Sequence, residues 1–380
     1  MAKGFQRFDL QPYLRREPVT LTLLTGLAIV LFSAVAGISH LYQAQQDALA
    51  VRWSARGAED LKAQNYQAAV ADFRTSLLYS RDNYGYQLNL ALALVGEKRY
   101  DEAYAYLINL WDSQPENGLV NLELARIAVV RGQTSTAIRY YHNAIYSVWP
   151  GSQDAERLST RIELIDLLLK IGAKAQAESE IIALAANLGN NPNEHAQAGQ
   201  LFLQAQDYQH ALDQFQLTLR GNPHDMAAMA GAGNAAFRLG QYASAERYLR
   251  QAVGAGNKAD RTQLRVAELI LELDPFRRQV SAVNRARITL DAYTAAGARL
   301  QSCSPPGSFP LPAATLASLT QDWTKMKPEM TPLRLRRNPD LVNSAMQLVF
   351  NIERETSGMC GSPTDTDNAL LLISNLHEGL

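Results

Sequence analysis

Residues 65–73 read NYQAAVADF, and this pattern of an alanine followed four residues later by a bulky apolar residue returns five more times. The alanines are Ala69, Ala103, Ala137, Ala177, Ala211 and Ala245, and the bulky residues are Phe73, Leu107, Tyr141, Ile181, Phe215 and Leu249. Successive copies lie 34, 34, 40, 34 and 34 residues apart. A fixed period of this length is typical of a solenoid of repeated structural units.

Each period contains two amphipathic stretches of about a dozen residues, which is the length of an ordinary helix. In the second stretch, the alanine and the bulky residue lie one helical turn apart on the same face. The small residue lets two helices approach closely, and the large one fills the space beside it. One helical pair cannot bury that face alone, so neighbouring pairs must stack. The sequence therefore predicts an all-α solenoid of about six helical hairpins.

The repeated unit resembles the tetratricopeptide repeat over roughly residues 50–257. The matching residues are Trp53, Gly57, Tyr66, Ala69 and Phe73 in the first unit, Gly199, Tyr208, Ala211, Phe215 and Pro223 in the fifth, and Gly233, Tyr242, Ala245 and Ala252 in the sixth. Six units agree in register, which makes the resemblance specific.

Composition and motifs argue against several classes of function. The 380-residue chain has a formal net charge of −1, so no global charge attracts nucleic acid. The sequence contains no Gly-rich phosphate loop, metal-ligand cluster or nucleophile motif. We therefore expect a protein that is not an enzyme and that has no cofactor, no metal site and no nucleic-acid partner.

An apolar segment near the N-terminus predicts a membrane-spanning helix. No formally charged residue occurs between Glu17 and Asp47, and the 20 residues from Val19 to Ile38 have only Thr and Ser as polar interruptions. This length is sufficient to cross a bilayer. Because Lys and Arg precede the segment, residues 1–17 are predicted to be a cytoplasmic tail, residues 18–42 a transmembrane helix, and the repeats extracytoplasmic.

A secretory signal is the competing interpretation of this segment. Ala34-Val35-Ala36 has the small-x-small form of a signal peptidase site and follows an apolar core. Cleavage after Ala36 would release a soluble periplasmic protein. Both interpretations export the repeats.

The remaining boundaries follow from breaks in the repeat. The longer third interval predicts an insertion near residues 148–153 within the solenoid of residues 50–257, and there we expect Trp149 to cover exposed helix ends. Residues 258–302 are predicted to be capping helices, including a basic one whose arginines, Arg299 among them, form a solvated face. Residues 303–380 are predicted to be a Pro-rich segment followed by C-terminal helices.

The resemblance also implies a binding surface. In this family the first helix of each unit lines a concave groove that meets a protein or peptide ligand. The corresponding groove candidates here are Asn89, Leu92, Leu122, Arg126, Gln200, Gln204, Asn234 and Arg238. The Lys, Asn and Arg set that grips chaperone tails in some members is absent, because only Asn89 matches it and Glu123 stands at one of its other positions.

The two cysteines could form a disulfide. Cys303 and Cys360 are the only cysteines, and both lie outside the repeats. In an oxidising compartment such a pair is commonly joined. A bond between them would close a loop over the Pro-rich region and restrict a segment that lacks an obvious core of its own.

These observations together favour a non-catalytic scaffold or assembly factor. We expect it to be anchored by a single pass in the bacterial inner membrane, with its repeats in the periplasm and a protein or peptide of an envelope complex as its partner. It is similar to members of the family that pair an N-terminal anchor with external repeats. Two alternatives remain at this point: a soluble periplasmic adaptor, and a cell-wall or glycan enzyme with a catalytic C-terminal region.

Overall fold

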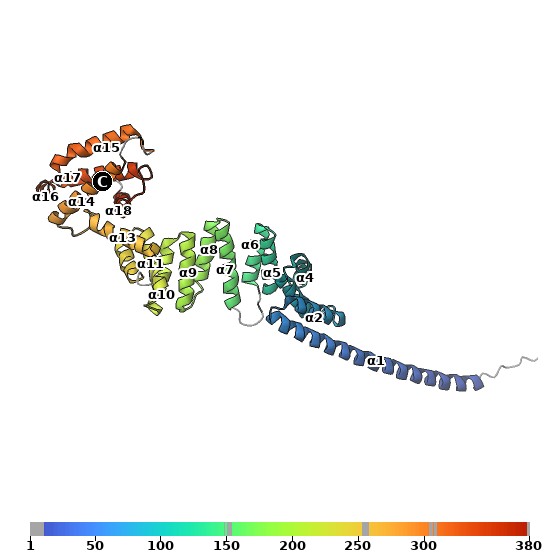
Figure 1. Cartoon of the computed structure of the whole chain (residues 1–380). Helices are drawn as coiled ribbons and strands as arrows, with labels where there is room; N and C mark the ends of the chain where they lie inside the picture. The colour runs from blue at the N-terminus through green and yellow to red at the C-terminus, as the bar shows by residue number, and fades with distance from the viewer. Residues whose placement is uncertain are drawn as a thin grey trace, which may run out of the picture. The chain divides into compact units, whose positions relative to one another are not determined.

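The structure is a computed structural model that describes residues 11–147, 149, 154–252, 258–303, 307 and 310–377. In these residues it contains α-helices and one short 3₁₀ helix, and no β-strand (Figure 1). The predicted all-α fold of stacked helical hairpins is confirmed. The chain divides into two compact units, Met1–Leu164 and Ile165–Leu380.

The first unit consists of three helical hairpins and the start of a further helix. The second helix of each hairpin packs against the first, and each hairpin packs against the next. Its helices are α1 (Gln11–Lys62), α2 (Tyr66–Tyr79), α3 (Tyr84–Gly96), α4 (Tyr100–Ser113), α5 (Gly118–Val130) and α6 (Thr134–Tyr146). Helix α7 (Asp154–Lys170) runs through the division between the units.

The second unit continues the hairpins and ends in a helical cap. The repeat helices are α8 (Lys174–Ala185), α9 (Pro192–Ala205), α10 (Tyr208–Gly221), α11 (Met226–Arg238) and α12 (Tyr242–Ala252). The helices that follow are α13 (Lys258–Leu273), α14 (Ala282–Ser302), α15 (Ala313–Met326), η2 (Lys327–Glu329), α16 (Pro332–Arg337), α17 (Pro339–Thr356) and α18 (Asp365–Leu376).

The repeated alanines lie where helices meet. All six of them, from Ala69 to Ala245, have 0% of their surface exposed. The bulky residue four positions later is also buried in every unit, from Phe73 to Leu249. The packing predicted from the alanine pattern is therefore confirmed.

The turn between the two helices of each unit has the same backbone conformation. The residue five positions before each alanine has a positive φ, between 61° and 77°. Three of these residues are glycines, which adopt this conformation without a steric penalty. The others are Gln64, Lys98 and Gln206. The fixed turn sets the angle at which the second helix folds back on the first.

Asn or Asp side chains cap the start of four first helices. Asn83, Asn117, Asn191 and Asp225 each accept a hydrogen bond from a backbone N–H in the first turn of α3, α5, α9 and α11. Each cap satisfies a donor that has no partner inside the helix. These positions recur at the repeat interval, so the caps fix where each first helix begins.

The apolar N-terminal segment and the first repeat helix form one continuous helix. Helix α1 is 52 residues long and shows no break where the sequence predicted separate elements, residues 18–42 and the solenoid from residue 50. Its C-terminal part packs against α2, with Ala50 buried and Gly57 next to the Phe73 ring. Residues 1–10 of the predicted tail at residues 1–17 lie outside the described residues, and residues 11–17 belong to α1.

Trp149 lies in the insertion predicted near residues 148–153, and the other residues of that range fall outside the described ones. Its side chain is buried, and its indole N–H donates to the carbonyl oxygen of Ala144 at 2.8 Å. The ring lies directly against Gly118 at the start of α5, where a Cβ atom would come within 2.4 Å of it. Trp149 thus covers the ends of α5 and α6, as a structural plug would.

The C-terminal helices form one core with the end of the solenoid. Residues of α12, α13, α14, α17 and α18 share a single hydrophobic cluster that extends from Tyr242 to Ile373. Helix α18 packs back on α13, where His377 Nε2 lies 3.1 Å from Asp274 Oδ1. The domain boundary predicted at residue 302 therefore falls inside a single hydrophobic core.

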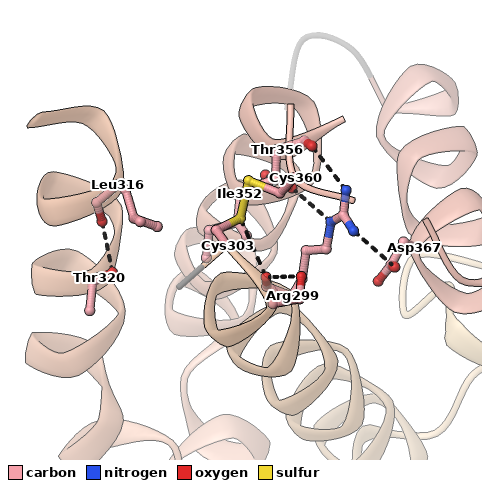
Figure 2. Close-up of a disulfide and its surroundings, with 9 residues drawn as sticks. Arg299, Cys303, Leu316, Thr320, Ile352, Thr356, Cys360 and Asp367 are labelled. Atoms are coloured by element: carbon pink, nitrogen blue, oxygen red, sulfur yellow. Dashed lines mark hydrogen bonds and ion pairs between the residues drawn. A yellow bond between two sulfur atoms is a disulfide. The ribbon is translucent and has the colours of Figure 1, made fainter. Parts of the chain in front are cut away.

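A disulfide and a buried arginine connect the helices of this cap (Figure 2). The sulfurs of Cys303 and Cys360 are bonded, and their Cα atoms lie 4.9 Å apart. Arg299 donates from Nη2 to the carbonyl oxygen of Thr356 at 2.9 Å and from Nε to its hydroxyl at 3.2 Å. Only 4% of Arg299 is exposed, so the prediction that it belongs to a solvated face is wrong. The return of residues 353–367 over α14 covers it.

Candidate protein-binding surface

The first helices of neighbouring hairpins lie side by side within each unit. In the first unit α3 contacts both α1 and α5, and in the second unit α9 contacts α11. The outward faces of these helices therefore adjoin and form one surface in each unit. The eight groove candidates lie on α3, α5, α9 and α11.

The candidates in the first unit differ in how much surface they offer. Asn89 and Leu92 on α3 are half-buried, and Arg126 on α5 is exposed. Leu122 is only 5% exposed and belongs to the core, so it cannot contribute the contact that the family positions imply.

Arg126 lies in a network of charged and polar groups. Its guanidinium donates to both oxygens of Glu163, at 2.5 and 3.0 Å, and to Glu123 Oε1 at 2.6 Å. Such a bidentate pair holds the planar guanidinium in one orientation. Tyr141 donates its hydroxyl to Glu163 Oε2 at 3.2 Å. The network connects α5, α6 and the start of α7.

Burial controls the protonation of this network. Glu123 is 4% exposed, and its Oε2 has no hydrogen-bond partner among the described residues. Burial raises the pKa of the Glu123 carboxyl, and the charge of Arg126 opposes this. The hydrogen bonds to Glu163 raise the pKa of Arg126, and burial raises that of Tyr141. Arg126 is thus committed to an internal role that limits its freedom to bind a partner.

No motif or spacing in the sequence pairs Glu163 with Arg126. The two residues are 37 positions apart, and the insertion between them disturbs the 34-residue register.

The candidates in the second unit are more accessible. Gln200 and Gln204 are exposed and lie one turn apart on α9. On α11, Asn234 is half-buried and Arg238 is exposed. The guanidinium of Arg238 lies over the Tyr208 ring at 5.1 Å and donates from Nε to the Tyr208 hydroxyl at 3.1 Å. This contact fixes the arginine head group at the end of α11.

The surface of the second unit suits hydrogen bonding to a peptide. Amide side chains such as those of Gln200, Gln204 and Asn234 both donate and accept hydrogen bonds. A polypeptide backbone presents the complementary groups at every residue. The fixed charge of Arg238 adds a site for a carboxylate.

The repeats match a known family model. The model of the tetratricopeptide repeat family matches residues 55–118 and 197–260. These segments include α2 and α4 in the first unit and α10 and α12 in the second. The chain therefore carries tetratricopeptide repeats in these two segments.

Several solved structures are similar to this chain. PilF of Pseudomonas aeruginosa is 17% identical, with 57% of this chain and 96% of that one covered and a TM-score of 0.40. The C-terminal part of a repeat protein from Cytophaga hutchinsonii is 15% identical, covering 62% and 92%, with a TM-score of 0.45. PilW, described as a type IV pilus biogenesis factor, is 16% identical, covering 57% and 98%, with a TM-score of 0.40. No curated protein matches the chain significantly. Because these TM-scores are low, we assign no function from these structures.

Proposed function

We propose that this protein is a non-catalytic scaffold or assembly factor that binds a protein or peptide through the first helices of its repeats. The exposed, hydrogen-bonding row of Gln200, Gln204 and Arg238 on α9 and α11 carries this proposal. Tetratricopeptide repeats form protein-binding scaffolds, and this surface has the chemistry that a peptide requires.

We further propose that α1 anchors the protein in the bacterial inner membrane. Its apolar stretch has a mean hydropathy of 2.3, and none of that stretch is buried in the fold. Leu24 and Phe32 are examples, with 64% and 77% of their surfaces exposed. Leaving a continuous apolar helix in water is costly, and a bilayer would cover it.

The disulfide supports an extracytoplasmic position for the repeats and the cap. Disulfides persist in oxidising compartments such as the periplasm and are rare in the cytosol. Cys303 and Cys360 are both buried, so the bond is a structural one and is not exposed to exchange. Together with the excess of Lys and Arg before Pro18, this favours a cytoplasmic N-terminus.

The continuity of α1 favours an anchor over a cleaved signal. Cleavage after Ala36 would leave residues 37–49 as a projecting helical end that belongs to no repeat. Determining the N-terminal residue of the protein purified from membranes separates these alternatives. A mature chain that begins at Gly37 would contradict the anchor.

The chemistry of the cap does not favour the enzyme alternative. A cavity beside α15 has no charged residue in its lining. A second cavity of about 10 Å³ adjoins Arg299, Glu353 and Asp367 and has room for about one water. Neither cavity combines the space and the acid, base or nucleophile that a glycan-cleaving site requires.

The orientation is tested by reporter fusions after Leu380. A reporter that is active only outside the cytoplasm should be active there, and a cytosolic reporter should be inactive. The reverse result would place the repeats in the cytosol and reject the orientation.

The binding surface is tested by site-specific photo-crosslinking in cells. A photoreactive residue placed at Gln204 should form an adduct with the partner, whereas one at Gln209, exposed on α10, should not. Equal adducts at both positions, or none at Gln204, would contradict binding at the first helices.

A further inference from the structure

A cavity of about 410 Å³ lies between α14 and α15 in the C-terminal cap. Cavities of roughly 300–1,000 Å³ are those that bind small molecules in proteins. Figure 2 shows two of its lining residues, Leu316 and Thr320, on α15 across from the disulfide helices. The cavity is open to solvent along α15, where Ala313 and Ala317 are exposed.

The C-terminal end of α15 packs tightly against α14 beside this cavity. The rings of Tyr293 and Trp323 stack with centroids 5.3 Å apart, and the indole N–H of Trp323 donates to the Tyr293 carbonyl oxygen at 3.1 Å. The Tyr293 hydroxyl donates in return to the Trp323 carbonyl oxygen. Trp323 also covers Gly297, where a Cβ atom would come within 2.4 Å of the ring. The cavity wall is thus fixed before any ligand enters.

The greater part of the lining is hydrocarbon. Leu300, Leu316, Ala313, Ala317 and Gly297 are apolar. The Thr320 hydroxyl already donates to the Leu316 carbonyl oxygen at 2.7 Å, and the indole N–H of Trp323 is bonded as described above. The only other polar side chain in the lining is Gln301, which is exposed at the edge.

This lining distinguishes between two apolar occupants. An extended peptide segment would bring a backbone N–H and C=O at every residue, and burying these groups without partners is costly. A saturated acyl chain has no polar group apart from its head group. The lining has no charged residue, and its Thr320 hydroxyl and Trp323 indole N–H are already bonded. It therefore favours an acyl chain whose head group stays in solvent.

We propose that the cavity between α14 and α15 binds the acyl chain of a single-chain fatty acid. The inference rests on the proposed membrane anchor, because a protein held at a bilayer meets fatty acids released from it. The cavity would give the cap a ligand site separate from the repeat surface.

The proposal is tested with the full chain reconstituted in phospholipid vesicles. The probe is a hexadecanoic acid that carries a photoreactive diazirine on its chain, and labelled peptides are located by mass spectrometry. Ala317→Trp fills the cavity from an exposed position, and Ala314→Trp is the matched control, since Ala314 is exposed on the same helix outside the lining.

Peptides of α14 and α15 should be labelled in the unaltered protein and in Ala314→Trp, and at least tenfold less in Ala317→Trp. Unlabelled hexadecanoic acid should compete better than octanoic acid, by about fourfold for each methylene that enters the cavity. Absence of label on α14 and α15, or equal label in Ala317→Trp, would overturn the proposal.

The apolar part of α1 provides an independent readout in the same experiment. It should be labelled equally in all three proteins if it spans the bilayer. Label on α15 without label on α1 would support the cavity and reject the membrane anchor. Label on α1 alone would support the anchor and reject the cavity.

Discussion

Ala103 and Ala105 lie two positions apart on α4, one in a helix contact and the other in solvent. Ala103 has none of its surface exposed, whereas Ala105 is exposed. A larger side chain at Ala103 would force neighbouring helices apart, because protein interiors are close-packed. We expect Ala103→Leu to lower the free energy of unfolding by about 1–3 kcal/mol.

Ala105→Leu adds the same side chain to the same helix and should change stability by less than about 0.5 kcal/mol. Hydrogen exchange should rise first in α3, α4 and the adjoining helices, since units of a solenoid depend mainly on their neighbours. Equal effects of the two substitutions would show that the alanine is not a packing residue.

Glu353 is a buried carboxyl without sufficient partners. It is 2% exposed, its Oε1 has no hydrogen-bond partner among the described residues, and Arg299 and Asp367 line the same small cavity. Burial first, and then the charge of Asp367, raise the pKa of Glu353 from 4.5 to about 8, while Arg299 opposes the shift. The folded cap thus holds a proton on Glu353 at a pH where the unfolded chain releases it.

The stability of the cap should therefore fall as the pH rises. Because the folded-state pKa is the higher one, the loss begins near pH 4.5 and is complete near pH 8, reaching on the order of 5 kcal/mol. Glu353→Gln should remove most of this slope, since an amide stays neutral. The measurement is denaturant unfolding at pH 5 and pH 8, and a slope that is unchanged in the variant would contradict the assignment.

At the scale of the elements, the recurring turn determines how the hairpins form. Gly132 has a φ of 69° and Lys98, one repeat earlier, has a φ of 61°. For a residue with a Cβ atom the left-handed conformation costs about 1–2 kcal/mol. The same backbone conformation is therefore unstrained at Gly132 and strained at Lys98.

Reciprocal substitutions test this assignment. Lys98→Gly should raise the free energy of unfolding, and Gly132→Ala should lower it by about 1 kcal/mol. Thermal or denaturant unfolding of the two single variants measures the difference. Two changes of the same sign would mean that the turn conformation is not what decides them.

At the scale of the whole molecule, the single helix α1 contains both the exposed apolar stretch and the first helix of the first repeat. Its apolar part is exposed, and its C-terminal part covers α2 through Ala50 and Gly57. We expect a chain that begins at Gln46 to stay folded and to be soluble without detergent, because it keeps the contact with α2.

A chain that begins at Gln64 lacks α1 entirely and exposes the buried face of α2, including Phe73. It should lose hydrogen-exchange protection in α2 and tend to aggregate. Equal protection of α2 in both truncated chains would show that α1 is not part of the first repeat.

The sequence by itself determined the repeats. Contacts within and between successive hairpins join residues at a fixed spacing, so Ala69 and its counterparts could be placed in the core and the all-α solenoid predicted. The groove candidates were implied by the family resemblance, and of those on α9 and α11, Gln200, Gln204 and Arg238 are exposed. Local periodicity is sufficient wherever each unit repeats the contacts of the last.

Only the tertiary structure decided the contacts that break this periodicity. Arg126 pairs with Glu163 across an interval of 37 residues that does not follow the repeat, and Leu122 is buried at a position where the family places a groove contact. The burial of Arg299 and the cavity beside α15 arise because the C-terminal helices fold back over α14. These contacts join residues far apart in the chain without a repeating interval, so no spacing in the sequence could place them.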